Sequence, residues 1–355
     1  MPYTAQDNHK ITQIAWLLMV ASTQNKLDVP GEYLWNIPAN GKFHEIRSKT
    51  WSAFSSGNCI KDKPIIEFIE NVNPSKYLRD PHIVKRFEEF FPHWLTSCAR
   101  FKLDGLEQFK HSCFAQGSQE YFTNFYLMNR HKRFRIFRGE YWWHMEICDK
   151  MGLRWAYLED DVLSKDDVVI LSHPFANLGD EHPQYKDLIY QCERMGVPVM
   201  LDMIYLPNST EEQMTIDLNP TCIKYLSFSL SKAFPIANAR VALRMTREKI
   251  LDPIQISNDE NVSNRLATGL GLEMMQAFEV DYMVKRYAQE QQHWCKALGL
   301  KPTKVVHFAL GEPYTEVGRD KNKRFFSKFN DQQNRYNLGP LFVNKKLLQE
   351  CGMYE

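Results

Sequence analysis

The chain of 355 residues lacks any apolar run long enough to cross a membrane. A transmembrane helix needs about 20 consecutive apolar residues, whereas the apolar segment at residues 11–22 is shorter and is interrupted by Gln13. That segment also lacks the charged start of a secretory signal, so we expect an amphipathic helix there. The sequence therefore favours a cytoplasmic protein without a membrane partner.

Excess charge of one sign is also missing. Lysine and arginine number 44 against 43 aspartate and glutamate residues, which gives a formal net charge of +1. No bulk electric field would recruit nucleic acid, so no nucleic-acid partner is expected. The chain does contain one basic run, Arg130–Arg135. Because charge runs usually lie on a solvated face, we expect this run to be exposed.

Closely paired cysteines are absent too. The eight cysteines are scattered, and no two stand in a C-x-x-C arrangement. Zinc sites and thiol redox motifs need such spacing, so no metal site is expected. Several cysteines fall in apolar stretches, which predicts buried, reduced side chains.

The middle of the chain contains alternating short apolar runs and a helical pattern. Continuous apolar runs at Asp167–Ser172, Val197–Asp202 and Ile223–Phe228 predict buried strands, and Gln184–Met195 predicts a helix between the first two. Strand–helix–strand alternation with apolar strands indicates an α/β fold with a mostly parallel sheet covered on both faces.

The last third has a different pattern. The segment Asn261–Leu298 contains no proline and predicts a long helical region. Two short apolar pieces, Lys304–Ala309 and Leu338–Val343, resemble strands. This part would suit a second, smaller unit beside the sheet.

Polar residues of particular chemistry interrupt the apolar middle. Lys232 lies in an apolar segment, which disfavours the charged form of an amine and suits a nucleophile. Asp202 ends a predicted strand, where α/β sheets bind ligands, and a buried carboxylate needs a partner. From the residues alone, Lys232 could equally be a surface loop lysine, Asp202 a helix cap and Arg240 part of a surface ion pair.

The spacing of these residues resembles that of a known family. Asp202-Met-Ile-Tyr205, Ser229-Leu-Ser-Lys232 and Arg240, eight positions after the lysine, resemble the signature of fold-type I pyridoxal phosphate (PLP) enzymes, in particular the class I/II aminotransferases such as aspartate aminotransferase. The resemblance extends more weakly over residues 75–340. It implies a PLP-binding α/β large domain at residues 56–255, a discontinuous α+β small domain at 1–55 and 256–355, and a homodimer.

The resemblance also implies roles around the cofactor ring. Lys232 would form a Schiff base with PLP and act as general acid and base at the substrate Cα. Asp202 would hold the pyridine nitrogen, and Tyr205 and Asn177 would bind the phenolate oxygen. Asn177 would also contact the substrate. Tyr141 would stack on the ring, although Trp142, Trp143 or plain core packing are alternatives for that position.

The remaining cofactor and substrate contacts follow from the same resemblance. A strand–glycine–helix turn presents backbone N–H groups to a phosphate. Arg335 precedes x-Asn near the C-terminus and would clamp the α-carboxylate of an amino acid with its planar guanidinium. The predicted phosphate-binding residues are Gly117, Ser118, Gln119, Ser229, Arg240 and, from the neighbouring subunit, Tyr77.

The chain departs from the family pattern in two places. The loop His173–Gly179 keeps a proline, Asn177 and the final glycine but loses a Pro-Thr pair. Glycines near the lysine are replaced by Pro235, Ala237 and Ala239, which reduces backbone freedom. A weaker match, Asn36–Gly41, resembles a substrate-facing loop.

The resemblance implies an aminotransferase that moves an amino group between an α-amino acid and a 2-oxo acid. The same site also suits β- or γ-elimination, side-chain cyclisation or oxidation of an amino acid, and the sequence leaves these open. A PLP-binding protein without turnover is the third alternative. It predicts a bound chromophore that responds to no amino acid.

Overall fold

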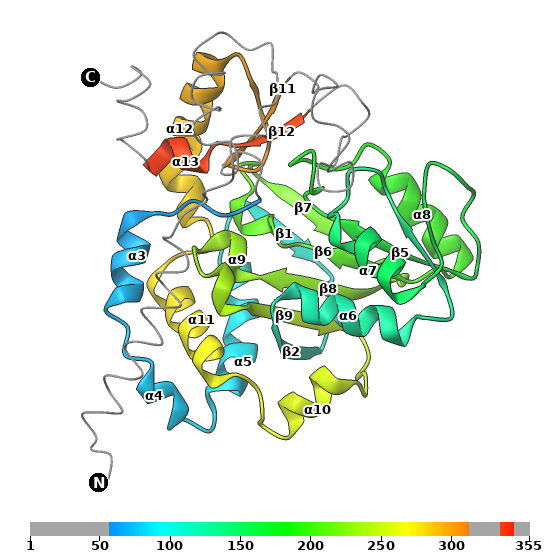
Figure 1. The fold of residues 1–355 in the computed structure, drawn as a ribbon, viewed down its shortest axis with the longest axis horizontal. Coiled ribbons are helices and arrows are strands. Elements are labelled where there is room, and N and C mark those ends of the chain that lie inside the picture. Colours follow the sequence, from blue (N-terminus) through cyan, green and yellow to red (C-terminus); the bar gives the residue numbers. More distant parts are fainter. Residues whose placement is uncertain (1–56, 312–333, 344–355) are drawn as a thin grey trace.

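The structure, a computed structural model, describes residues 57–311 and 334–343. Within them, seven strands form one sheet in the order β2–β9–β8–β6–β5–β3–β4 (Figure 1). All neighbours from β8 to β4 are parallel, whereas β9 is antiparallel to both β8 and β2. The strands are β2 (His111–Gln116), β3 (Arg133–Ile136), β4 (Trp155–Tyr157), β5 (Asp167–Ser172), β6 (Val199–Asp202), β8 (Ile223–Ser229) and β9 (Val241–Thr246).

The sheet is buried on both faces. Successive side chains of a strand point to opposite faces, and in β5 Val168 and Ile170 join one apolar cluster while Val169 and Leu171 join another. The first cluster contains residues of α6 (Ser118–Met128) and α7 (Trp143–Met151). The second contains residues of α5 (Ile83–Thr96), α8 (Tyr185–Met195) and α11 (Arg265–Ala277). The predicted α/β fold with a mostly parallel, doubly covered sheet is confirmed.

Local sequence signals explain where several helices begin and end. The Asp62 side chain accepts a hydrogen bond from the Ile65 amide and so caps α3 (Lys63–Glu70). Glycines in the left-handed conformation, which other residues rarely adopt, end α7, α8 and α12 (Tyr282–Leu298). The other short elements are α4 (Ser75–Leu78), α9 (Leu230–Ala233), α10 (Pro253–Asp259), η1 (Leu106–Gln108), η2 (Leu206–Asn208) and η3 (Ala237–Ala239), and β1 (Phe101–Asp104) pairs in parallel with β7 (Met214–Asp217).

The last third departs from the predicted elements. The segment predicted as one helical region divides into α11 and α12, because Phe278 is extended and its ring packs against Phe68, Phe234 and Tyr282. The strand predicted at residues 304–309 starts only at Phe308. It is β11 (Phe308–Gly311), which lies between β10 (Lys301–Pro302) and β12 (Asn334–Asn337) in an antiparallel sheet.

The prediction of a strand at residues 338–343 is wrong. This segment forms α13 (Gly339–Val343). Asn337 caps it, since its side-chain oxygen accepts from the Gly339 amide, and the following proline is favourable in a first helical turn. A short apolar run does not by itself distinguish a strand from a buried helix.

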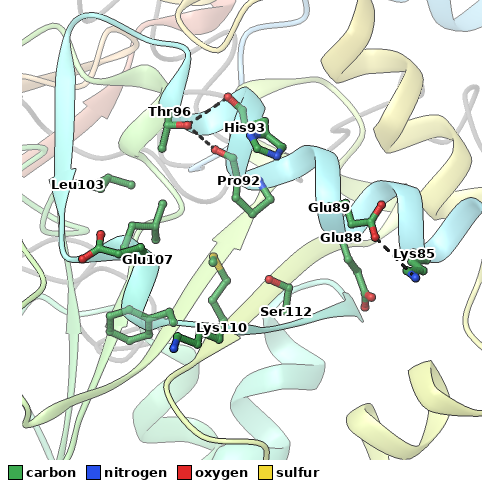
Figure 2. Close-up of a pocket in the computed structure, with 13 residues that line it drawn as sticks. Lys85, Glu88, Glu89, Pro92, His93, Thr96, Leu103, Glu107, Lys110 and Ser112 are labelled. Atoms are coloured by element: carbon green, nitrogen blue, oxygen red, sulfur yellow. Dashed lines mark hydrogen bonds and ion pairs between the residues drawn. The ribbon is translucent and has the colours of Figure 1, made fainter.

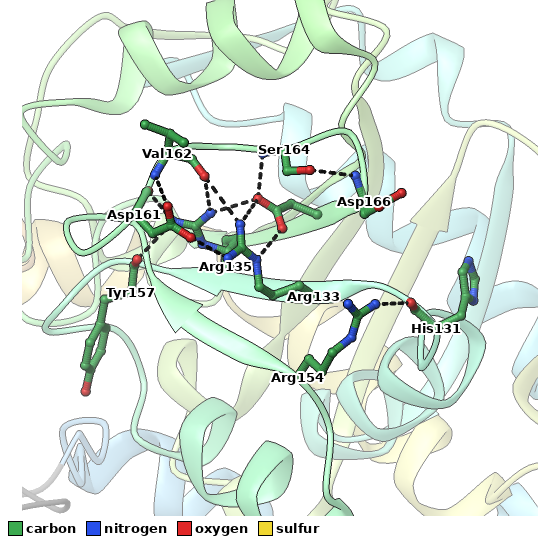
Figure 3. Close-up of polar contacts among 10 residues, drawn as sticks. His131, Arg133, Arg135, Arg154, Tyr157, Asp161, Val162, Ser164 and Asp166 are labelled. Carbon is green, nitrogen blue, oxygen red and sulfur yellow. Dashed lines mark hydrogen bonds and ion pairs between the residues drawn. The ribbon is translucent and has the colours of Figure 1, made fainter.

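The basic run at residues 130–135 is exposed only in part: Arg130 and His131 are exposed as the sequence predicted, whereas the end of the run is buried. Arg135 on β3 is fully buried and donates to the Asp167 carboxylate at 2.8 Å and to the Tyr157 carbonyl at 3.0 Å. Arg133 donates to the other Asp167 oxygen at 2.7 Å (Figure 3). The two guanidinium groups therefore join β3 to the start of β5 and to the loop at residues 157–166.

Removal of the shared carboxylate is expected to destabilise the fold strongly. Asp167→Asn leaves the Arg135 charge buried without a counter-charge, and breaking such a pair typically costs about 3–5 kcal/mol in free energy of unfolding. The control is Asp160→Asn, which removes an exposed pair with Arg138 and should cost at most about 1 kcal/mol. Urea denaturation of both variants measures the difference. Equal small losses would contradict the structural role of Asp167.

Two other expectations concern cysteines and membranes. Seven cysteines fall in the described residues, and all are buried and free, in agreement with the prediction for them.

Among the described helices, none combines the length and apolar character that a membrane span requires.

Candidate active site

The polar residues predicted for the site gather at the carboxyl ends of the central strands. Asp202 ends β6 and lies in register with Ser172, the end of β5, and with Ser227 near the end of β8. Lys232 lies on the short helix α9, directly after β8. In open α/β sheets, this edge is where ligands bind.

Lys232, Tyr205 and Arg335 converge from three distant segments. All three surround Gly57. A Cβ atom added to Gly57 would lie 2.7 Å from the Tyr205 hydroxyl, 3.6 Å from Lys232 Nζ and 3.7 Å from Arg335 Nη2. The Lys232 ammonium also lies 5.9 Å from the centre of the Tyr205 ring. An amine, a phenol and a guanidinium therefore share one small space that a side chain at residue 57 would reduce.

Asp202 is almost fully buried, and it lies close enough to Lys232 for that charge to act on its carboxyl group. Among the described residues, its Oδ1 atom has no hydrogen-bond partner. Burial raises the pKa of Asp202 to about 7, although Ser227, the Ile204 amide and the Lys232 charge act in the opposite direction. A buried carboxyl with one unpaired oxygen fits a protonated ring nitrogen, which would supply the missing partner.

A second corner of the site gathers donors suited to a phosphate. Gly117 precedes α6 with φ +77°, and a Cβ there would lie 2.5 Å from Arg240 Cζ, so only glycine leaves room for the guanidinium. Arg240 donates to the Gln119 side chain at 3.2 Å, and Gln119 donates to the Tyr141 hydroxyl at 3.3 Å. Ser118 is buried at the start of α6. Free N–H groups and the helix dipole favour an anion at such a terminus.

Ser229 ends β8 and directly precedes α9, the helix that carries Lys232. Its hydroxyl caps α9 by accepting from the Ser231 amide at 3.2 Å, and it donates to the Val241 carbonyl at 3.0 Å. The side chain therefore fixes the turn that presents Lys232.

Arg335 is held over the site by its neighbours on the small sheet. It lies opposite Leu310 in the β11–β12 pair, and its guanidinium stacks on the Phe308 ring at 4.3 Å. Its Nη1 atom donates to the Ala176 carbonyl, in the loop that carries Asn177. Ala176 also packs with Tyr205 and Phe308, whereas Asn177 is buried one residue further along.

Two sequence predictions lie outside this assembly. The Tyr77 ring packs on Gly269 of α11, where a Cβ would lie 2.2 Å from the ring. Its contact with a phosphate of the neighbouring subunit stays a prediction. The segment Asn36–Gly41 lies outside the described residues.

The structure also brings in residues that the sequence did not indicate. Gly57 belongs to no motif. Glu140 precedes Tyr141 and is buried; the Ser172 amide donates to it at 3.1 Å, and burial raises its pKa to about 8. Asn208 donates to the Lys232 carbonyl, and His307 contacts Asn208. A lone histidine or asparagine in an apolar stretch resembles an ordinary core residue, so no sequence signal distinguished them.

A separate groove of about 600 Å³ lies between α5 and the segment at residues 103–112 (Figure 2). It contains Glu88, whose pKa burial raises to about 7, and Lys110. Within α5, Pro92 lacks an N–H group, and the Thr96 hydroxyl donates to the Pro92 carbonyl at 2.9 Å. None of the predicted site residues lines this groove.

Comparisons with known proteins identify the family and the fold of the chain. Residues 103–352 match the family described as aminotransferase class I and II. A comparison with curated proteins gives no significant match.

Solved structures show the same fold at low identity. A probable N-succinyldiaminopimelate aminotransferase from Thermus thermophilus has a TM-score of 0.58 at 15% identity, covering 88% of this chain and 98% of its own. Tyrosine aminotransferase from Leishmania infantum has a TM-score of 0.58 at 10% identity, covering 92% and 98%. L-threonine-O-3-phosphate decarboxylase from Porphyromonas gingivalis has a TM-score of 0.54 at 13% identity, covering 84% and 98%.

The chain belongs to the class I and II aminotransferase family and has the fold of type I PLP enzymes. Its cofactor is PLP. The unpaired Asp202 oxygen and the donors around Gly117 fit a ring nitrogen and a phosphate. The resemblance identified from the sequence is confirmed.

Proposed function

We propose that the protein is a PLP-dependent aminotransferase that moves an amino group between an α-amino acid and a 2-oxo acid. The observation that carries the proposal is the convergence of Lys232, Tyr205 and Arg335 around Gly57. An amine and a carboxylate-binding guanidinium in one space match a substrate with both an α-amino and an α-carboxylate group.

Several residues would hold the cofactor. PLP supplies an aldehyde for an amine and a ring that withdraws electrons from the substrate Cα. Asp202 would pair with its ring nitrogen, and Tyr205 and Asn177 would bind the phenolate oxygen. Tyr141 would stack on the ring. The phosphate would be bound by Gly117, Ser118, Gln119, Ser229 and Arg240, together with Tyr77 of the partner subunit in a homodimer.

The protein's own groups then perform the transfer. Lys232 Nζ would hold the cofactor in the resting enzyme and would be free to move protons once an amino acid is bound. Arg335 fixes the substrate carboxylate, which turns the Cα–H bond toward the freed amine. Lys232 Nζ takes the Cα proton as general base and later returns a proton as general acid. We further propose that residues 56–255 form the large domain and that residues 1–55 with 256–355 form the small domain.

A second candidate keeps the same site but ends in elimination, cyclisation or oxidation. The loop at residues 173–179 keeps this candidate open, because it departs from the family pattern beside the proposed substrate position. Product analysis separates the two, since only transamination yields a 2-oxo acid together with an aminated cofactor.

Arg335→Lys tests the proposed substrate contact. The variant keeps the charge but loses the planar fork, and loss of a charged hydrogen bond costs about 1.5–3 kcal/mol. We expect kcat/KM for the amino donor to fall about 10- to 100-fold, mostly through a higher KM. The control is Arg247→Lys. Arg247 also stacks on an aromatic ring, that of Phe109, but it lies beside the start of β8, the end of that strand away from Lys232. Equal kinetics for both variants would refute the role of Arg335.

A further inference from the structure

Two buried residues outside the family signature join the site segments at one point. Asn208 ends η2, three residues after Tyr205, and both it and His307 are fully buried. The Asn208 Nδ2 atom donates to the Lys232 carbonyl at 2.9 Å and lies 3.1 Å from His307 Nδ1. One amide group therefore bridges the main chain of Lys232 and the imidazole of His307.

The chemistry of this bridge fixes the state of both side chains. A backbone carbonyl only accepts hydrogen bonds, so the NH₂ group of Asn208 must face Lys232. Its second N–H then faces His307 Nδ1, which must accept, and this leaves a neutral imidazole with its proton on Nε2. The surroundings favour the same state, because burial and the charges of Lys232 and Arg335 lower the pKa of His307 well below its usual value.

The main chain around His307 is connected to the same segments. The Val306 amide donates to the Asn208 carbonyl at 2.9 Å, and the Leu338 amide donates to the His307 carbonyl at 2.8 Å. The next residue, Phe308, packs its ring at 5.1 Å from the Tyr205 ring and 4.3 Å beneath the Arg335 guanidinium. His307 thus contacts Asn208, which binds the main chain of Lys232, and Phe308 contacts Tyr205 and Arg335.

We propose that Asn208 and His307 are positioning residues that fix the main chain of Lys232 relative to Arg335. Their bridge holds the amine at the distance from which it reaches the Cα of a substrate held by its carboxylate. This inference rests on the proposed function and deepens it. It predicts that loss of the bridge slows proton transfer and leaves carboxylate binding largely intact.

Two variants of nearly equal shape isolate the bridge. His307→Asn keeps an acceptor close to the position of Nδ1, whereas His307→Leu does not. Because small misplacement of a reacting group costs up to about 100-fold in rate, we expect His307→Leu to lower kcat by about 10- to 100-fold. The KM for the amino donor should change by less than about threefold, because Arg335 keeps its contacts. His307→Asn should recover most of the lost rate.

A readout independent of turnover accompanies the kinetics. In the cofactor-free protein, hydrogen–deuterium exchange at residues 229–236 should be faster in His307→Leu than in His307→Asn. With PLP added, the visible circular dichroism of the cofactor should weaken in the leucine variant alone. These readouts do not require transamination, so they test the bridge even if the wild-type protein proves to catalyse another reaction.

Asn208→Ala provides a second test if the leucine variant does not fold. It should reproduce the loss in kcat and the faster exchange, and in the double variant with His307→Asn it should remove the rescue. Equal kcat, exchange and dichroism in the leucine and asparagine variants would overturn the proposal. So would a loss confined to KM.

Discussion

Lys232→Ala is expected to lower transamination by at least about 10⁴-fold, because it removes both the amine that bonds the cofactor and the general base. The visible absorbance of PLP bound to an amine of the protein should disappear as well. Lys224→Ala, on the same β8–α9 segment, is the control and should keep both properties. Absorbance spectra and single-turnover rates with an amino acid measure the two effects.

The spectrum separates this interpretation from a looser one. If PLP occupied the pocket without a bond to Lys232, the Lys232→Ala variant would keep its absorbance band at the same wavelength as the wild type. Survival of the visible band in that variant would mean that another amine holds the cofactor. The assignment of the site would then be wrong, whatever the activity.

Asp202→Asn is expected to have the second largest effect. The variant keeps the shape of the side chain but removes the charge that would pair with the ring nitrogen. Loss of one partner from a buried pair costs about 2–5 kcal/mol, so kcat/KM should fall by about 30- to 5,000-fold. A fluorescence titration should also give weaker PLP binding. Unchanged kinetics would exclude the pairing.

The same variant should alter the pH dependence of stability without cofactor. Burial raises the pKa of Asp202 from 3.8 to about 7. Between these values the folded chain binds more protons at this group than the unfolded chain does, so its free energy of unfolding falls as the pH rises. Asp202→Asn removes that contribution and should flatten the decline relative to the wild type. Urea denaturation between pH 4 and pH 7 measures the difference.

The sequence predicted those parts of the site that depend on short-range spacing. Asp202 ends β6 and Lys232 follows β8, and the carboxyl ends of these parallel strands meet at one edge of the sheet. Arg240 reaches the same edge because it directly precedes β9, which runs antiparallel to β8. Apolar runs located β5, β6 and β8 correctly, whereas β9 was not predicted. In this part of the fold, residues near the ends of neighbouring strands are close in space, so their spacing in the sequence predicts that they meet.

Other parts depend on contacts between distant segments, which no local pattern encodes. Gly57 lies beside Lys232 only because the chain before α3 crosses the carboxyl edge of the sheet. His307 reaches Asn208 across 99 positions. Arginine is usually a surface residue. Arg135 is buried because Asp167, which starts the neighbouring strand, supplies the counter-charge. The break at Phe278 arises from aromatic packing rather than from a proline or glycine.

The central claim is that Lys232 and PLP act on an α-amino acid held by Arg335. The most direct test is an absorbance spectrum of the purified protein with PLP, followed by titration with a panel of amino acids and assay of the 2-oxo acid released. The account predicts a visible band that at least one amino acid converts to the aminated cofactor, with one equivalent of 2-oxo acid. A protein that develops no such band even with excess PLP, or a band that no amino acid changes, would contradict it.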